Sequence, residues 1–109
     1  MKITVRRYRR SDRQFFVKCM EEMQGHIASI DKLKRTRPVS QFSGEQWVDL
    51  ILNKIKKYKG AIFIAQAEDG ASVGCIVGII KESTKIDLID LFPFKDGRII
   101  ELFVDPSYR

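Results

Sequence analysis

Two side chains of this chain could act as bases in a reaction. Glu101 is the single carboxylate in the otherwise apolar residues 99–104, and a carboxylate in such a setting can remove a proton from a substrate. His26 is the only histidine among the 109 residues. Its imidazole titrates near neutral pH, so it could serve as a base or remain a partly exposed structural residue.

The two cysteines do not add a reactive site. Cys19 and Cys75 are far apart in the sequence and each lies among apolar residues, which is typical of buried, reduced thiols. A disulfide is disfavoured in the cytoplasm, where we expect this chain. No pair of cysteines has metal-ligand spacing and His26 cannot complete a Cys/His site alone, so we expect no metal.

The chain carries a net charge of +6, with basic clusters at residues 6–13, 32–37 and 54–59. Such a surface attracts nucleic acid, acidic proteins or an anionic cofactor, although solvated lysines at helix flanks explain most of it. A hydrophobic content of 44% is ordinary for one folded domain. We find neither a signal-peptide segment nor an apolar run of the roughly 20 residues that cross a membrane.

The first half of the sequence predicts one strand and two helices. Residues 3–6 alternate as in a strand, and Ser11 and Asp12 are suited to cap a helix over residues 12–28, which Gly25 weakens near its end. A polar, basic connection follows over residues 31–42. Ser43 and Gln46 have the spacing of a capping box, which begins a second amphipathic helix that reaches about residue 58 and stops before a glycine at position 60.

The second half predicts three strands. Residues 61–67 are apolar on both faces, which indicates a central strand, and a turn follows at Asp69–Gly70. In the partner strand, residues 73–80, Gly74 and Gly78 suggest a bulge or a close backbone approach. Residues 81–97 either extend this hairpin or cover a neighbour, and Asp96–Gly97 is expected to turn the chain into a strand at residues 98–104.

The predicted architecture is a single α+β (α/β) domain over residues 1–109, in the order β-α-α-β-β-β with a mostly antiparallel sheet. An apolar sheet needs a covering layer on each face, and two helices cover only one of them well. The architecture therefore looks incomplete on its C-terminal side. The aromatic residues are interpreted as core: Phe15, Phe16, Trp47 and Tyr58.

Residues 100–109, which read I-E-L-F-V-D-P-S-Y-R, carry a resemblance to a known family. They resemble the GNAT superfamily of acetyltransferases, in which a hydrophobic strand leads to V-D-P-x-Y-R and the acetyl-CoA motif R/Q-x-x-G-x-G/A starts at that same arginine. The glycine spacing of residues 73–78 and the opening residues 3–12 are similar to the family as well. The resemblance implies the N-terminal portion of a GNAT domain, ending at Arg109 where the phosphate-binding loop would begin.

The resemblance implies an acetyl-CoA-dependent N-acetyltransferase, in which an amine attacks the thioester directly within a ternary complex. Acetyl-CoA would then lie along the main chain of Leu102, Phe103 and Val104, and Arg109 would open its phosphate-binding loop. Glu101 would act as the general base, or contact a cationic substrate, or do neither. The acceptor would be an amine-bearing small molecule or a protein N-terminus or lysine, and the family's tyrosine acid would lie after Arg109.

Other interpretations stay open beside the enzyme. A basic module that binds RNA or protein without catalysis is the alternative, but RNA binding predicts exposed aromatics between basic residues on a sheet face, where these strands carry aliphatics. The basic residues 31–37 could favour an acidic acceptor, contact the cofactor's 3′-phosphate or form a solvated loop. We expect no useful catalysis from the 109 residues alone.

The enzyme interpretation requires a particular position for the strand at residues 98–104. Its main chain must lie at an open edge, because a closed sheet would leave no place for a pantetheine arm. An open edge also invites pairing with a second copy, so a homodimer is expected.

Overall fold

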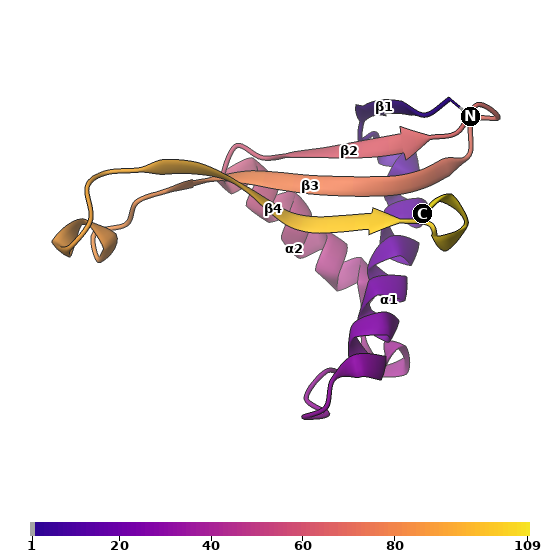
Figure 1. The fold of residues 1–109 in the computed structure, drawn as a ribbon, viewed down its shortest axis with the longest axis horizontal. Coiled ribbons are helices and arrows are strands. Elements are labelled where there is room, and N and C mark those ends of the chain that lie inside the picture. The colour runs from indigo at the N-terminus through magenta and orange to yellow at the C-terminus, as the bar shows by residue number, and fades with distance from the viewer. Residues whose placement is uncertain (1) are drawn as a thin grey trace.

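The predicted elements occur in the predicted order in a computed structural model, which describes residues 2–109. Four strands form one antiparallel sheet, and two helices pack on one of its faces (Figure 1). The elements are, in chain order, β1 (Thr4–Arg7), α1 (Arg13–Ile30), α2 (Gly44–Lys57), β2 (Ala61–Gln66), β3 (Ser72–Glu82) and β4 (Lys95–Val104). The α+β class and the antiparallel sheet are therefore confirmed.

The sheet is open, with the strand order β1-β2-β3-β4. Strand β2 lies between β1 and β3, as its two apolar faces predicted, and β4 forms an edge. The core fills the space between the sheet and the helices and is made of apolar side chains from both layers: Phe16, Val17, Cys19, Met20, Val48, Ile51, Ile62, Ile64, Cys75, Val77 and Phe103. Neither helix has the length and apolar character needed to cross a membrane, over the residues that the model describes.

The start of α1 differs from the prediction. Asp12 was expected to cap the helix, but its side chain makes no such hydrogen bond, and a short 3-10 turn, Arg10–Asp12, comes before α1. The Asp12 carboxylate instead accepts two hydrogen bonds of 2.8 Å from the Arg6 guanidinium and one of 2.7 Å from the Arg9 N–H. Because Asp12 is buried, a charged partner stabilises it more than a neutral N–H would.

The ends of the helices also correct the sequence analysis. Helix α1 continues past Gly25 to Ile30, two residues beyond the predicted end at residue 28. Gly25 lies against Val39, where a Cβ would come within 3.1 Å of a methyl carbon. Ser43 caps α2 through the Gln46 N–H as predicted, at 3.2 Å. Lys59, with φ of 52°, takes the left-handed conformation after α2. Gly60 is needed for close approach, because its Cβ would lie 2.4 Å from the Gly78 carbonyl oxygen.

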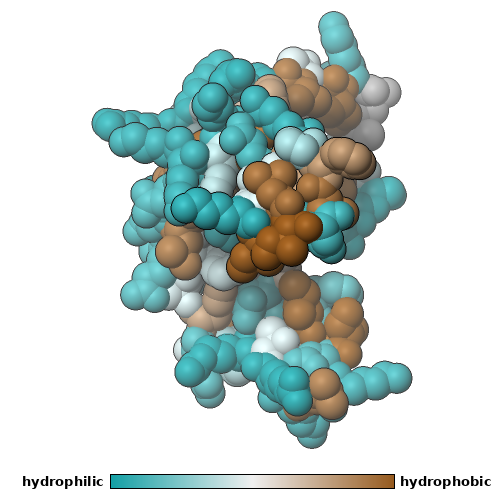
Figure 2. Space-filling model, turned by 90° about the vertical axis from the view of Figure 1, so that its left-hand side faces the viewer, coloured by the Kyte–Doolittle hydropathy of each residue, from teal (hydrophilic) through white to brown (hydrophobic). Residues whose placement is uncertain are grey.

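Residues 81–97 extend the β3–β4 hairpin rather than cover a neighbour. Asp96 and Gly97 do not turn the chain; they pair with Lys81 and Ile80, because cross-strand hydrogen bonding outweighs the local turn preference of the dipeptide. The hairpin projects beyond the helices (Figure 1) and its tip exposes large apolar side chains (Figure 2). These tip residues are Ile86, Leu88, Ile89, Leu91 and Phe92.

Both cysteines are free and buried, as expected. Cys19 on α1 and Cys75 on β3 belong to the same core cluster. A hydrogen bond with the Cys75 thiol and burial both raise the pKa of the Cys19 thiol far above its ordinary value. The Cys19 thiol is therefore not poised to act as a nucleophile at neutral pH.

Two of the four aromatic side chains assigned to the core are not fully inside it. Phe16 is completely buried and Phe15 packs against the core from its margin. Trp47 and Tyr58 are 39% and 40% exposed. Trp47 lies in the first turn of α2 and Tyr58 directly follows the last residue of this helix.

Candidate active site

Strand β4 combines an open edge with a bulge. Val77 pairs with Glu101 and the next residue, Gly78, pairs with Ile99, so Ile100 is an extra residue in β4. The bulge expected from the glycines of β3 thus lies opposite Gly78. The close approach occurs at Gly74, where a Cβ would lie 2.8 Å from the Phe103 carbonyl oxygen.

The direction of the main-chain groups can be followed along β4 beyond the bulge. The Asp105 N–H donates to the Val73 carbonyl at 2.8 Å. Since successive residues of a strand direct these groups to opposite sides, Phe103 uses its N–H and C=O toward β3, whereas Leu102 and Val104 direct theirs to the open edge. The edge that the enzyme interpretation requires is therefore available at two of the three predicted cofactor-binding residues.

The side chains of this segment alternate between the two faces of the sheet. Phe103 is buried among the helix-facing core residues, and Leu102 is 58% exposed on the opposite face. Arg109 folds back on the strand: its Nε donates to the Val104 carbonyl at 2.7 Å and its guanidinium lies 5.7 Å from the centre of the Phe103 ring. The Val104 carbonyl therefore already accepts one hydrogen bond from Arg109, and its second lone pair can accept from another donor.

Glu101 is half-buried on the helix-facing side of β4. Its Oε1 accepts a hydrogen bond of 3.3 Å from the indole Nε1 of Trp47 on α2. Burial raises the pKa of the Glu101 carboxyl above its ordinary value, and the Trp47 hydrogen bond and the charge of Lys54 oppose that rise. A carboxylate with a raised pKa is a better proton acceptor than an ordinary glutamate, which suits a general base.

A hollow of about 540 Å³ lies where the connection between α1 and α2 meets the start of α2. We call it the α1–α2 hollow. Seven of its ten lining residues are polar or cationic, and an aromatic pair and a leucine complete the wall: Gln24, Arg35, Thr36, Arg37, Gln41, Phe42, Ser43, Gln46, Trp47 and Leu50. Trp47 lines this hollow and also contacts the candidate base, Glu101.

The basic connection beside this hollow has a defined structure. The Asp31 carboxylate accepts hydrogen bonds from the main-chain N–H groups of Leu33, Arg35 and Thr36 and from the Thr36 hydroxyl, at 2.7–3.0 Å. These bonds, the Thr36 hydroxyl first among them, lower the pKa of Asp31. Gln24 adds a bond of 2.9 Å to the Arg37 carbonyl. The segment is therefore held in shape and is more than a solvated loop.

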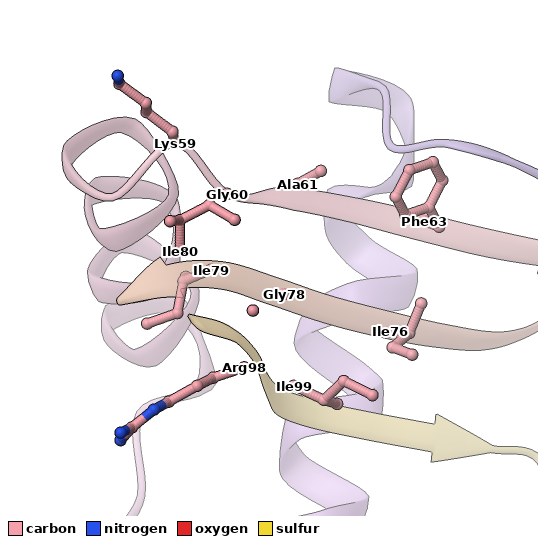
Figure 3. Close-up of a pocket in the computed structure, with 11 residues that line it drawn as sticks. Lys59, Gly60, Ala61, Phe63, Ile76, Gly78, Ile79, Ile80, Arg98 and Ile99 are labelled. Carbon is pink, nitrogen blue, oxygen red and sulfur yellow. The ribbon is translucent and has the colours of Figure 1, made fainter. Parts of the chain in front are cut away.

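A second, smaller hollow lies on the sheet face that the helices leave uncovered. Its volume is about 330 Å³ and its floor is apolar, with Gly60 and Gly78 providing space where other residues would project a side chain. Lys59 and Arg98 lie at its end nearest the hairpin (Figure 3). No Asp, Glu or His residue lines this hollow, and Glu101 faces the helices on the other side of the sheet.

Three solved structures with a similar fold were compared. An acetyltransferase from Vibrio fischeri matches with a TM-score of 0.66 and 15% identity, over 97% of this chain and 72% of its own. An acetyltransferase of the GNAT family from Staphylococcus aureus matches with 0.62 and 17%, over 98% and 56%. The fold is that of the GNAT acetyltransferases. A mutant of the BH1408 protein from Bacillus halodurans matches with 0.75 and 11%, over 97% and 64%.

This chain thus spans between 56% and 72% of the length of these GNAT-like proteins. No family model matches the sequence, and no curated protein does so either. At these identities the comparisons establish the fold, which is the GNAT fold, and the chemistry has to be argued from the site.

The GNAT-like fold brings some of the predicted residues together and separates others. Glu101, Leu102 and Val104 follow one another beyond the bulge of β4, and Arg109 returns to them. His26 is exposed on α1 and lines none of the hollows described here. Over residues 2–109, no three His, Cys, Asp or Glu side chains cluster so as to hold a metal ion.

Sequence reasoning missed one residue of the site and did not settle a second feature. Trp47 was interpreted as core because it falls at helical spacing with apolar residues, and no local signal reveals a partner that is 54 residues away. The α1–α2 hollow was anticipated only as a basic connection. One signal could have indicated an ordered loop here. Asp31 is followed within the same polar segment by Thr36, and aspartate side chains commonly bond to nearby main-chain and hydroxyl groups in turns.

Proposed function

We propose that this chain acts in an N-acetyltransferase, which transfers an acetyl group from acetyl-CoA to an amine by direct attack in a ternary complex. One observation carries the proposal: beyond the bulge, β4 offers unpaired main-chain groups at its open edge, and a half-buried carboxylate, Glu101, precedes them directly. The GNAT fold supports the same conclusion.

The residues of β4 fit the two demands of such a reaction. The outward N–H and C=O groups of Leu102 and Val104 would hold the amide-bearing pantetheine arm as a further strand would be held. The Leu102 N–H would stabilise negative charge on the thioester oxygen. Acetyl-CoA supplies the activated acetyl group. Phe103 would not bind the cofactor through its main chain, because that main chain pairs with β3; its side chain anchors the strand in the core.

Glu101 would supply the base. An amine is protonated at neutral pH, so it must lose a proton before its lone pair can attack the thioester carbon. The half-buried Glu101 carboxylate would take this proton, directly or through a water molecule. The bond from the acetyl carbon to sulfur then breaks, and the thiolate leaves with the electron pair.

The test of cofactor binding uses the 109-residue chain and amide NMR spectra. On addition of acetyl-CoA we expect the largest shifts at the amides of Leu102 and Val104. Leu102→Pro removes the outward N–H but no bond to β3, and should weaken binding by at least tenfold. Leu102→Ala, which keeps the N–H, is the matched control and should bind as the unchanged chain does.

Two results would count against this cofactor site. Shifts confined to the basic residues 32–37 and 54–59 would mean that only the phosphates are attracted by charge. Equal binding by the proline and alanine variants would mean that the Leu102 N–H is not used. The 109 residues contain no R/Q-x-x-G-x-G/A segment, so we expect weak binding and only background transfer from them alone.

The same open edge leads us to propose that two copies of this chain associate through β4. The outward main-chain groups of Leu102 and Val104 can pair with their counterparts in a second copy, and Ile99, 66% exposed on the same strand, would be covered in the process. Sedimentation equilibrium should detect a dimer that Ile99→Lys weakens. Ile89→Lys, an equal change at the hairpin tip, should leave it intact; a monomer at all concentrations would refute the pairing.

A further inference from the structure

The α1–α2 hollow has two guanidinium groups in its wall, and this feature bears on the identity of the amine. We propose that the acceptor also carries a carboxylate, which Arg35 and Arg37 bind. The inference rests on the proposed function in one respect, namely that the amine of this ligand is acetylated. The carboxylate site itself can be measured without acetyl-CoA.

Neither arginine has a counter-charge. None of the ion pairs found within residues 2–109 involves Arg35 or Arg37, whereas Arg6 and Arg13 each bind carboxylates of the chain. A guanidinium presents paired N–H donors that match the two oxygens of a carboxylate. Two such groups beside one hollow make it selective for an anion, and they repel a polyamine or an aminoglycoside.

The main chain that carries the exposed Arg35 and Arg37 side chains is ordered before any ligand binds. The main chain at Arg35 donates to Asp31 at 2.9 Å, and the carbonyl of Arg37 accepts from Gln24 at 2.9 Å. Because the segment is already ordered, less conformational entropy is lost when a ligand binds.

The aromatic part of the wall suits the amine end of the same molecule. Phe42 and Trp47 pack at a ring separation of 6.2 Å and provide an apolar surface. The Trp47 indole N–H in turn contacts Glu101 at 3.3 Å. The wall of the hollow therefore holds two cationic side chains and an aromatic pair, and one of these aromatic residues, Trp47, also contacts the Glu101 carboxylate. An amino acid whose amine and carboxylate are separated by a short chain, or a peptide that begins with an acidic residue, has this polarity.

The volume agrees with a small ligand. Pockets that hold small molecules measure roughly 300–1,000 Å³, and the α1–α2 hollow measures about 540 Å³. An amino acid fits within it completely, whereas a folded protein could present only a terminal segment. We therefore place the free amino acid first and the acidic peptide second.

The experiment uses Trp47, the single tryptophan of the chain, as a fluorescent reporter in the 109-residue protein. The probes are 4-aminobutyrate and n-butylamine, which share an amine and a four-carbon chain and differ in the carboxylate. We expect 4-aminobutyrate to change the emission with a dissociation constant at least tenfold lower than that of n-butylamine. A tripeptide with an N-terminal glutamate and an amidated C-terminus distinguishes a peptide acceptor from the free amino acid.

Two double variants with the same loss of charge provide the control. Arg35→Gln with Arg37→Gln should abolish the preference for 4-aminobutyrate. Lys32→Gln with Lys34→Gln changes exposed residues of the same segment that do not line the hollow, and should retain the preference. Equal binding of the two probes, or an equal loss in both double variants, would overturn the proposal.

Adenosine 3′,5′-bisphosphate tests the competing use of the arginines, as a site for the cofactor's 3′-phosphate. The carboxylate proposal is wrong if this bisphosphate binds more tightly than 4-aminobutyrate and if the Arg35→Gln, Arg37→Gln variant loses binding of the bisphosphate but not of 4-aminobutyrate. Failure of the acetyl-CoA titration with retained 4-aminobutyrate binding would refute the acetyltransferase function alone. A successful acetyl-CoA titration without 4-aminobutyrate binding would refute the acceptor assignment alone.

Discussion

Replacing Glu101 by glutamine should slow acetyl transfer by about 10²–10⁴-fold, the usual contribution of a general base. Glutamine keeps the size of the side chain and can still accept a hydrogen bond from Trp47, but it cannot take a proton from the amine. The measurement needs a polypeptide that includes a phosphate-binding loop. A chimera of residues 1–109 with the C-terminal part of the Vibrio fischeri acetyltransferase provides one, once it is shown to fold and to release thiol from acetyl-CoA.

The pH profile separates a base from a residue that only contacts the substrate. Burial raises the pKa of Glu101, so the rate should fall as the pH drops through that raised value, and the Glu101→Gln variant should lack this acidic limb. Trp47→Phe removes the hydrogen bond that lowers the pKa, so the limb should move to higher pH. A profile unchanged by either substitution would exclude the role of base.

Two controls show that the rate effect is not a loss of folding. Glu22→Gln removes an exposed carboxylate of α1 and should leave the rate unchanged. In the 109-residue chain, Glu101→Gln should not destabilise the fold at neutral pH. Because the pKa of Glu101 is raised in the folded state, this group favours folding at low pH and that contribution is lost as the pH rises through the folded pKa.

Replacing Asp12 by asparagine should lower the free energy of unfolding by about 3 kcal/mol, at the lower end of the range for a broken buried ion pair. Asp12 is 5% exposed and receives two hydrogen bonds from Arg6 and one from the Arg9 N–H. Without the carboxylate, the Arg6 guanidinium, whose side chain is 17% exposed, keeps its charge and loses its partner. For a domain whose total stability is about 5–15 kcal/mol, this is a large share.

The pH dependence gives the same interaction a second signature. The hydrogen bonds from Arg6 hold the pKa of Asp12 below its ordinary value. A carboxyl whose pKa is lowered on folding stabilises the fold at neutral pH, and this contribution is lost as the pH falls from the ordinary aspartate pKa through the lower folded one. Urea unfolding followed by circular dichroism should therefore show a smaller difference between Asp12→Asn and the unchanged chain at low pH than at pH 7.

The matched control is Asp49→Asn, which removes an exposed partner of Arg13. Solvent screens this pair, so little change in stability is expected. Equal losses in the Asp12 and Asp49 variants would mean that burial does not strengthen the Arg6–Asp12 interaction, and would contradict the role assigned to it at the start of α1.

The sequence by itself determined the order of the elements, the two buried thiols and the position of Glu101 on the last strand. These features depend on local patterns: the apolar period of α1 and α2, the alternation in the strands, and the cap at Ser43. Local patterns can be read because each depends on residues within a few positions of one another. The resemblance to the GNAT acetyltransferases added the expectation of an open edge.

Tertiary structure alone decided how the chemical groups meet. Asp96 and Gly97 have the sequence of a turn, yet pairing with β3 keeps them extended; Asp12 leaves the role of cap because Arg6 approaches it. Trp47 contacts Glu101, which is 54 residues away in the sequence. Leu102 and Val104 direct their main-chain groups to the open edge because those of Phe103 are bonded to β3. Contacts between distant segments form only when the sheet and helices pack, and their free energies then exceed the weak preferences of single residues.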